Sequence, residues 1–165
     1  MTKAHEFRIV TRWRVAATAE EVVAVLTDSA SLTRWWGQVY LAVAEVAPGD
    51  SAGIGRKVLV LSKGWLPYRL RWTGELVAAD LPRSWTIRTT GDLTGQGTWH
   101  LSEAQGWTEV VYDWSVSADR PLFRWLSPVL APVFAWNHRW AMARGAEGLR
   151  VEVARRRQAA HVLSG

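Results

Sequence analysis

The chain has 165 residues, twelve of them tryptophan, and its 20 Lys and Arg against 15 Asp and Glu give a net charge of +5. This length fits one domain, which we expect to span residues 1–165 and to bury roughly two-thirds of the surface of the unfolded chain. Cysteine is absent, which excludes disulfides, thiol catalysis and cysteine-bound metal centres.

The N-terminus carries charged residues and lacks an apolar run of signal-peptide length. The longest stretch poor in charge, residues 126–136, contains two prolines and is too short to cross a bilayer. With the absence of cysteine, these features predict a cytoplasmic protein that is not an integral membrane protein.

The first predicted element is a strand over residues 7–15, because apolar and polar residues alternate there. One face carries Phe7, Ile9, Trp13 and Val15, and the other carries three arginines. Thr18 and Glu21 have the spacing of a capping box and begin a short helix. A second short helix is predicted from Ser31 to Trp36.

The middle of the chain predicts only strands, separated by turns rich in Gly, Pro and Asp. Successive hairpins without intervening helices indicate an antiparallel meander. With the first strand this makes seven, the other six being residues 39–47, 56–62, 68–79, 84–90, 96–103 and 108–117.

The last third is predicted to be helical. Pro128 and Pro132 are expected to break or kink the chain, so that the main helix begins near Ala131 or Pro132 and runs to about Ala159. Gly145 and Gly148 are unfavourable in a helix and indicate a close approach to the sheet. Residues spaced by three or four form one face of this helix: Phe134, His138, Met142, Gly145, Leu149 and Val153.

Five tryptophans fall in phase with the apolar face of the strands: Trp13, Trp72, Trp85, Trp99 and Trp114. For any one of them a filled core is the simpler interpretation. Together, rings this large opposite small helix residues also fit the wall of a pocket for an apolar molecule. On the opposite face, the arginines of the first strand are expected to pair with Glu109 and Asp113 of the last.

The element order resembles the SRPBCC superfamily, in particular its polyketide cyclase/dehydrase-like and START-related members. The matching segments are residues 17–22, 26–28, 35–37, 55–58, 97–99, 106–110 and 138–145. The resemblance implies an α+β helix-grip fold, in which a seven-stranded curved antiparallel sheet wraps around a long C-terminal helix and two short helices follow the first strand. It also implies a cavity between sheet and helix, with Trp36, Tyr40 and the turn containing Leu66 nearer its entrance.

These arguments predict twelve ligand-binding residues: Trp36, Tyr40, Leu66, Trp72, Trp85, Trp99, Tyr112, Trp114, Phe134, Asn137, His138 and Met142. His138 is the candidate catalytic residue, because a histidine facing a cavity is able to act as an acid or base near neutral pH. The structural alternative is a core histidine bonded to a strand carbonyl. Tyr112 is able to donate a hydrogen bond to a ligand carbonyl or simply to fill space.

Other kinds of site have little support in the sequence. The histidines are dispersed without metal-ligand spacing, the acidic residues of the strands fall outside the concave face, and there is no dinucleotide fingerprint or nucleophile elbow. We therefore expect no metal and no cofactor. The excess arginines are scattered or lie near the end of the last helix, at 155–157, where they complement its dipole, so we expect no nucleic-acid partner.

The leading hypothesis is binding of a hydrophobic, aromatic or lipid-like small molecule between the sheet and the last helix. The alternative is a polyketide cyclase or dehydratase that uses the same cavity, with His138 as its acid or base. A third possibility is a structural module with a solid core. Residues 122–133 pack on the body or form a partner- or membrane-facing patch, and the oligomeric state stays open.

Overall fold

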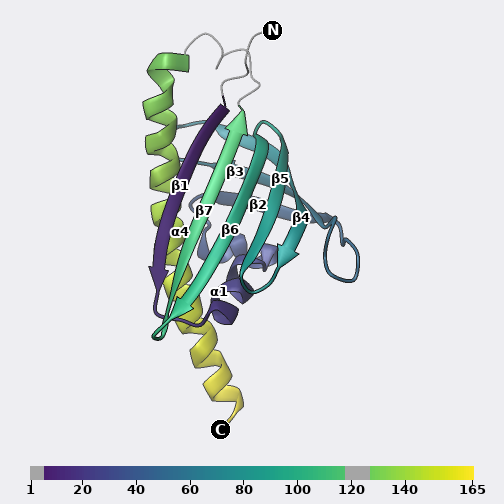
Figure 1. Cartoon of the computed structure of the whole chain (residues 1–165), viewed down its shortest axis with the longest axis vertical. Helices are drawn as coiled ribbons and strands as arrows, with labels where there is room; N and C mark the ends of the chain where they lie inside the picture. The colour runs from purple at the N-terminus through teal and green to yellow at the C-terminus, as the bar shows by residue number, and fades with distance from the viewer. Residues whose placement is uncertain (1–5, 118–126) are drawn as a thin grey trace.

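The structure is a computed structural model that describes residues 6–117 and 127–165, with side chains described for residues 8–117 and 131–165. After strand β1 (Glu6–Val15) come helix α1 (Ala19–Leu26), the short 3₁₀ turn η1 (Ser29–Ser31) and helix α2 (Leu32–Trp35). Six strands and helix α4 (Ser127–Leu163) follow (Figure 1). The strands are β2 (Tyr40–Ala47), β3 (Lys57–Lys63), β4 (Arg69–Asp80), β5 (Ser84–Gly91), β6 (Thr94–Ala104) and β7 (Trp107–Ser117).

All seven strands form one antiparallel sheet in the order β1-β7-β6-β5-β4-β3-β2. The sheet is strongly curved and α4 runs along it, with its C-terminal end projecting beyond the strands (Figure 1). The predicted α+β helix-grip fold is therefore confirmed, including the seven strands and the short helices after β1. The curvature leaves a concave face whose residues alternate with those of the outer face.

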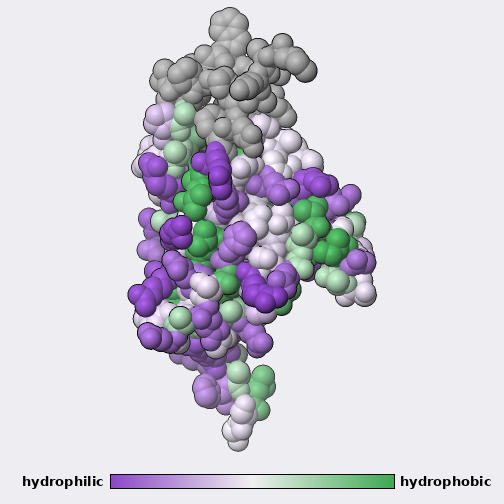
Figure 2. Space-filling model, in the orientation of Figure 1, coloured by the Kyte–Doolittle hydropathy of each residue, from purple (hydrophilic) through white to green (hydrophobic). Residues whose placement is uncertain are grey.

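The outer face of β1 and β7 is held by cross-strand charge pairs, as the sequence predicts. Arg8 lies 2.6 Å from Asp113, and Arg12 lies 4.0 Å from Glu109. Both pairs are at the surface, where solvent screens the charges and each pair contributes little to stability. Figure 2 shows hydrophilic residues spread over this side of the molecule with smaller apolar areas between them.

Helix α1 begins where the capping box predicts. The Thr18 side chain accepts a hydrogen bond from the Glu21 N–H, and the Glu21 carboxylate accepts one from the Thr18 N–H. This reciprocal pair satisfies two of the backbone donors that every helix N-terminus leaves free. The apolar stripe of α1 is buried, and Val22 and Val25 are fully inaccessible.

Helix α4 is longer than predicted. It begins at Ser127 and ends at Leu163, and Pro132 lies inside it. The predicted break before Ala131 is wrong. Pro128 is the second residue of the helix, where the N–H group has no intrahelical acceptor, so a proline there costs no hydrogen bond. Pro132 lies in the second turn and removes one hydrogen bond, which the helix accommodates without ending.

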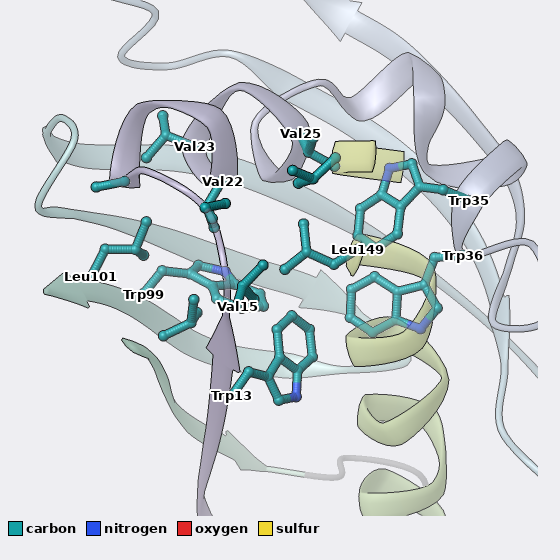
Figure 3. Packing of buried hydrophobic residues seen from close by; sticks show 14 of the residues in the cluster. Trp13, Val15, Val22, Val23, Val25, Trp35, Trp36, Trp99, Leu101 and Leu149 are labelled. Carbon is teal, nitrogen blue, oxygen red and sulfur yellow. The ribbon is translucent and has the colours of Figure 1, made fainter. Parts of the chain in front are cut away.

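The predicted inward face of α4 is confirmed, and Gly145 lies against Trp13 of β1 as well as Trp36, whereas Gly148 approaches a different partner. Met142, Leu149 and Val153 are buried. A Cβ at Gly148 would overlap the backbone carbonyl of Trp35, so the helix lies against α2 there rather than against the sheet. Figure 3 shows Leu149 among side chains from β1, α1 and α2, where Trp36 also packs.

The arginines at 155–157 are tied into ion pairs rather than left free near the helix end. The Glu152 carboxylate is only 2% exposed and binds Arg34 of α2 at 2.5 Å and both Arg155 and Arg156 at 2.9 Å. Arg156 also reaches Asp28 before η1, at 2.7 Å. The guanidinium of Arg155, with those of Arg34 and Arg156, holds the pKa of Glu152 well below its usual range. This cluster joins α4 to the short helices.

No helix in the described part of the chain combines the length and apolar character needed to cross a membrane. Residues 122–133 fall mostly outside the described side chains. Whether they pack on the body or form a partner- or membrane-facing patch therefore stays a prediction.

Candidate functional site

A cavity of about 210 Å³ lies between the concave face of the sheet and the N-terminal half of α4. Ten of the twelve predicted ligand-binding residues line it: Trp36, Tyr40, Trp72, Trp99, Tyr112, Trp114, Phe134, Asn137, His138 and Met142. The structure thus brings together residues from β2, β4, β6, β7 and α4 with Trp36, which directly follows α2. Most of the surface that they present is aromatic or aliphatic.

The two other predicted residues lie elsewhere. Trp85 lines a second cavity of about 240 Å³ between strands β3, β4 and β5 and the segment from Leu26 to Trp36. Leu66 is absent from the lining of both, although Gly64 and Tyr68 of the same loop line the first. Leu66 contributes instead through its backbone N–H, which donates to Asn137 Oδ1 at 3.2 Å.

An aromatic wall separates the two cavities. Five residues line both: Trp36, Tyr40, Trp72, Ile87 and Trp99. The ring of Tyr40 lies 5.0 Å from that of Trp36 and 6.3 Å from that of Trp72, so the three rings form a chain from α2 to β4. Such edge and tilted contacts are favourable geometries for aromatic pairs.

The inward-facing tryptophans do not all have the same surroundings. Some line a cavity, whereas Trp13 fills the core. It is 7% exposed, packs against Trp36 and Trp99 at 5.7 and 5.5 Å, and lines neither cavity. Trp72, Trp99 and Trp114 line the first cavity. The phase of the strands therefore identified the inward-facing rings, whereas the packing of α2 and α4 decided which of them border a void.

His138 is stacked flat on Trp114, with ring centres 4.7 Å apart, and its Nε2 lies 3.5 Å from the Thr11 hydroxyl. Its hydrogen-bonding contact is therefore with a side chain of β1 rather than with a strand carbonyl. Burial, with the nearby charge of Arg139, lowers the pKa of His138 to about 4. The imidazole is neutral at physiological pH.

Two tyrosines contribute phenol groups to the same wall. Burial raises the pKa of Tyr40 to about 12, and burial together with the charge of Tyr40 raises that of Tyr112 still further. Both are therefore protonated at neutral pH. The Tyr112 ring occupies the place where a side chain at Gly97 would lie, so this glycine lets the ring lie close to β6.

Asn137 fastens the β3–β4 loop to α4. In addition to its bond with Leu66, its amide lies where a side chain at Gly64 would be. Beside it, the exposed rings of Trp65 and Trp136 meet edge to face at 4.8 Å. The loop is thus held against the helix at the rim of the cavity.

Sequence reasoning missed several polar residues of the wall, including Ser62, Thr89 and Asp92. Asp92 lies in the turn after β5, where the sequence gives no sign of an inward position. Thr89 was detectable in principle, because it is in phase with Trp85 and Ile87 on the concave face of β5. Among the described residues, no group of three or more metal-ligating side chains is placed to hold a metal ion.

The comparisons with known proteins agree with this geometry. The family described as polyketide cyclase/dehydrase and lipid transport matches residues 6–154. The chain belongs to this family. A search of curated proteins gives no match.

Several solved structures of the superfamily are similar to the chain. A START superfamily protein from Mycobacterium smegmatis is 12% identical, with a TM-score of 0.74 over 90% of this chain and 97% of the other. An aromatase/cyclase from a Streptomyces species is 19% identical, with a TM-score of 0.74 over 94% and 98%. Norcoclaurine synthase of Thalictrum flavum, solved with a transition-state analogue, is 14% identical, with a TM-score of 0.60 over 92% and 98%. At these identities the likeness shows the fold alone.

Proposed function

We propose that this family member binds a small hydrophobic molecule, aromatic in preference to a long lipid, in the cavity between the sheet and α4. The observation that carries the proposal is the cavity itself, whose wall is built mainly from indole, phenyl and aliphatic groups. A mostly apolar wall with a few polar groups is the usual form of a small-ligand site. A structural module with a solid interior is disfavoured by the same cavity.

The cavity volume indicates the size of the ligand group that it is able to enclose. A dry cavity of about 150 Å³ is enough to hold benzene, and the cavity here is about 210 Å³. It therefore matches a molecule with one ring or two fused rings. Extended lipid tails need more room, because pockets for larger ligands occupy about 300–1,000 Å³.

The test is calorimetric titration of the whole chain with naphthalene and other uncharged ring compounds. Ala141 lines the cavity, so Ala141→Phe is expected to fill part of it and weaken binding at least about tenfold. Ala143 lies on the exposed side of the same helix, and Ala143→Phe should bind as the wild type does. Native mass spectrometry of gently purified protein would identify any carried ligand. Failure of the wild type to bind any compound of the panel would refute the proposal.

A polyketide cyclase or dehydratase is the second candidate. The observation that favours it is His138, whose neutral imidazole borders the cavity and would be able to accept a proton from a carbon between two carbonyl groups. In this case His138→Ala should abolish ring closure of a polyketide-like substrate and leave its binding intact. A variant that still turns over normally would remove the catalytic role.

A further inference from the structure

The second cavity is slightly larger than the first, about 240 Å³ against about 210 Å³. Three leucines in its lining, Leu26, Leu32 and Leu76, pack against the buried core but are themselves only partly buried. Apolar side chains that border an empty space lose the contacts that close packing would supply. The second cavity therefore presents apolar surface that a small molecule is able to cover.

The aromatic wall between the two cavities is held in place by hydrogen bonds. Trp72 Nε1 donates to Ser62 Oγ at 2.9 Å, and Trp36 Nε1 donates to the carbonyl of Ala141, also at 2.9 Å. The ring of Tyr40 lies against both indoles. Moving either indole out of the wall would leave its N–H without a partner away from water, which is costly. The two cavities are therefore separate compartments.

Trp99 continues this wall along the sheet. Its ring is stacked on Trp85 of β5, with ring centres 5.8 Å apart, and on Tyr112 of β7 at 4.2 Å. Trp85 lines only the second cavity and Tyr112 lines only the first. The border between the two compartments thus runs through Trp99.

The two compartments are lined by loops from opposite ends of strand β3. Gly64 and Tyr68 of the β3–β4 loop line the first cavity, whereas Ala52 of the β2–β3 loop and Leu81 of the β4–β5 turn line the second. In an antiparallel sheet the β3–β4 loop lies at one end of β3, and the other two connections lie at the other end. Ala52 and Leu81 are exposed, Leu81 to 50%. A small molecule is therefore able to reach the second cavity without passing through the first.

The lining of the second cavity favours an uncharged occupant. Among the described residues that line it, Arg56 alone carries a full charge. Arg56 Nη2 donates to the carbonyl of Thr27 at 2.6 Å, and its Nε lies 3.9 Å from the Glu45 carboxylate, so the guanidinium is engaged within the protein. Most of the other lining residues are aliphatic or aromatic. A dry cavity of about 150 Å³ is enough for benzene, so this larger one has room for one ring or two fused rings.

We propose that the second cavity is a binding site in its own right, which takes one uncharged molecule of one ring or two fused rings. Occupation of the first cavity is not required, because the aromatic wall separates the two compartments. One elongated molecule is not the expected ligand, because it would have to displace the hydrogen-bonded indoles in order to span both cavities. The site lies beyond the one described under the proposed function and is tested separately from it.

The first experiment is calorimetric titration of the whole chain with naphthalene. The wild type should bind two molecules per chain. Val58 lines only the second cavity, and Val58→Phe should bind one molecule because a phenyl ring there would occupy the space of the ligand. Ala141→Phe, which fills the first cavity, should also bind one, and the double variant none. Leu59 is 49% exposed at the next position of β3, and the control Leu59→Phe should still bind two.

Methyl NMR spectra locate each bound molecule without relying on a substitution. With ¹³C-labelled methyl groups, Met142 reports on the first cavity and Leu76 on the second. Naphthalene should shift both signals in the wild type and only the Met142 signal in Val58→Phe.

The possible outcomes separate this proposal from the proposed function. One molecule per chain with the Leu76 signal unshifted would overturn the second site and leave the proposed function standing. A single molecule that is lost in both Val58→Phe and Ala141→Phe would mean that one ligand spans the wall, which also overturns the second site. A shift of Leu76 without any shift of Met142 would support the second site and count against the proposed function. Absence of both heat and shifts would overturn both.

Discussion

His138 and Tyr40 in the cavity wall are kept neutral by burial. The same desolvation lowers the pKa of His138 to about 4 and raises that of Tyr40 to about 12, since it disfavours the charged form in each case. At pH 7 both therefore present neutral hydrogen-bonding groups. Neither side chain therefore brings a charge to the cavity wall.

His138 should make the stability of the fold depend on pH. Its folded pKa of about 4 lies below its ordinary value of 6.5, so the unfolded chain binds a proton that the folded chain does not. The free energy of unfolding is therefore expected to fall as the pH is lowered from 6.5 towards 4, by at most about 3 kcal/mol. Urea unfolding across this range measures the slope, and His138→Phe should reduce it. Parallel curves for the two proteins would contradict the prediction.

The two halves of helix α4 contact different parts of the molecule. Residues from Phe134 to Ala141 border the cavity, whereas Leu149 and Val153 belong to the buried core with α1 and α2. Gly148 allows the second half to lie directly on Trp35 of α2, and Gly145 allows it to lie on Trp36 and Trp13. Ligand contacts and core packing are thus separated along one element.

Gly148→Ala tests this close approach. Helix propensity alone predicts a gain of about 1 kcal/mol for the substitution. The added methyl group would overlap the carbonyl oxygen of Trp35, and we expect a net loss of about 2 kcal/mol in the free energy of unfolding. At the exposed position Ala154 of the same helix, Ala154→Gly should lose about 1 kcal/mol from propensity alone. A Gly148→Ala variant more stable than the wild type would contradict the prediction, because the contact with Trp35 would then leave room for a methyl group.

Across the whole molecule, the buried core and the cavities share side chains. The buried core and the Glu152 cluster fasten α4 to α1, η1 and α2. Trp36 and Trp99 belong to this core and also line both cavities. The same rings therefore contribute both to stability and to the cavity wall.

Glu152→Gln is expected to lower the free energy of unfolding at pH 7 by about 2 kcal/mol, because it removes a buried charge that three arginines share. Since the folded pKa of Glu152 is depressed, the difference from the wild type should be full above the ordinary glutamate pKa of 4.5 and shrink as the pH falls below it. Glu147, an exposed residue of α4 paired with Arg144, provides the control, and Glu147→Gln should change stability by less than about 0.5 kcal/mol. Equal effects of the two substitutions would rule out the special role of Glu152.

Local patterns in the sequence predicted most of the elements and the inward phase of the strands. The capping box at Thr18 and the alternation around Trp13 depend on neighbours a few residues apart, so one chain is enough to reveal them. The start of α4 was misplaced because proline near a helix N-terminus is tolerated, and the local rule overstates its effect. The pairing of Glu152 with Arg34 joins residues 118 positions apart and has no local signal.

The sequence by itself determined the fold class, the inward-facing tryptophans and ten of the residues that line the cavity, because periodicity and element order encode which side chains share a face. Only the tertiary structure decided that Trp13 is core and Trp114 is wall, that Trp85 faces a second cavity, and that the Thr89 hydroxyl is left without a partner. These outcomes depend on how closely α2 and α4 approach the sheet, and that distance is set by packing among residues far apart in the chain.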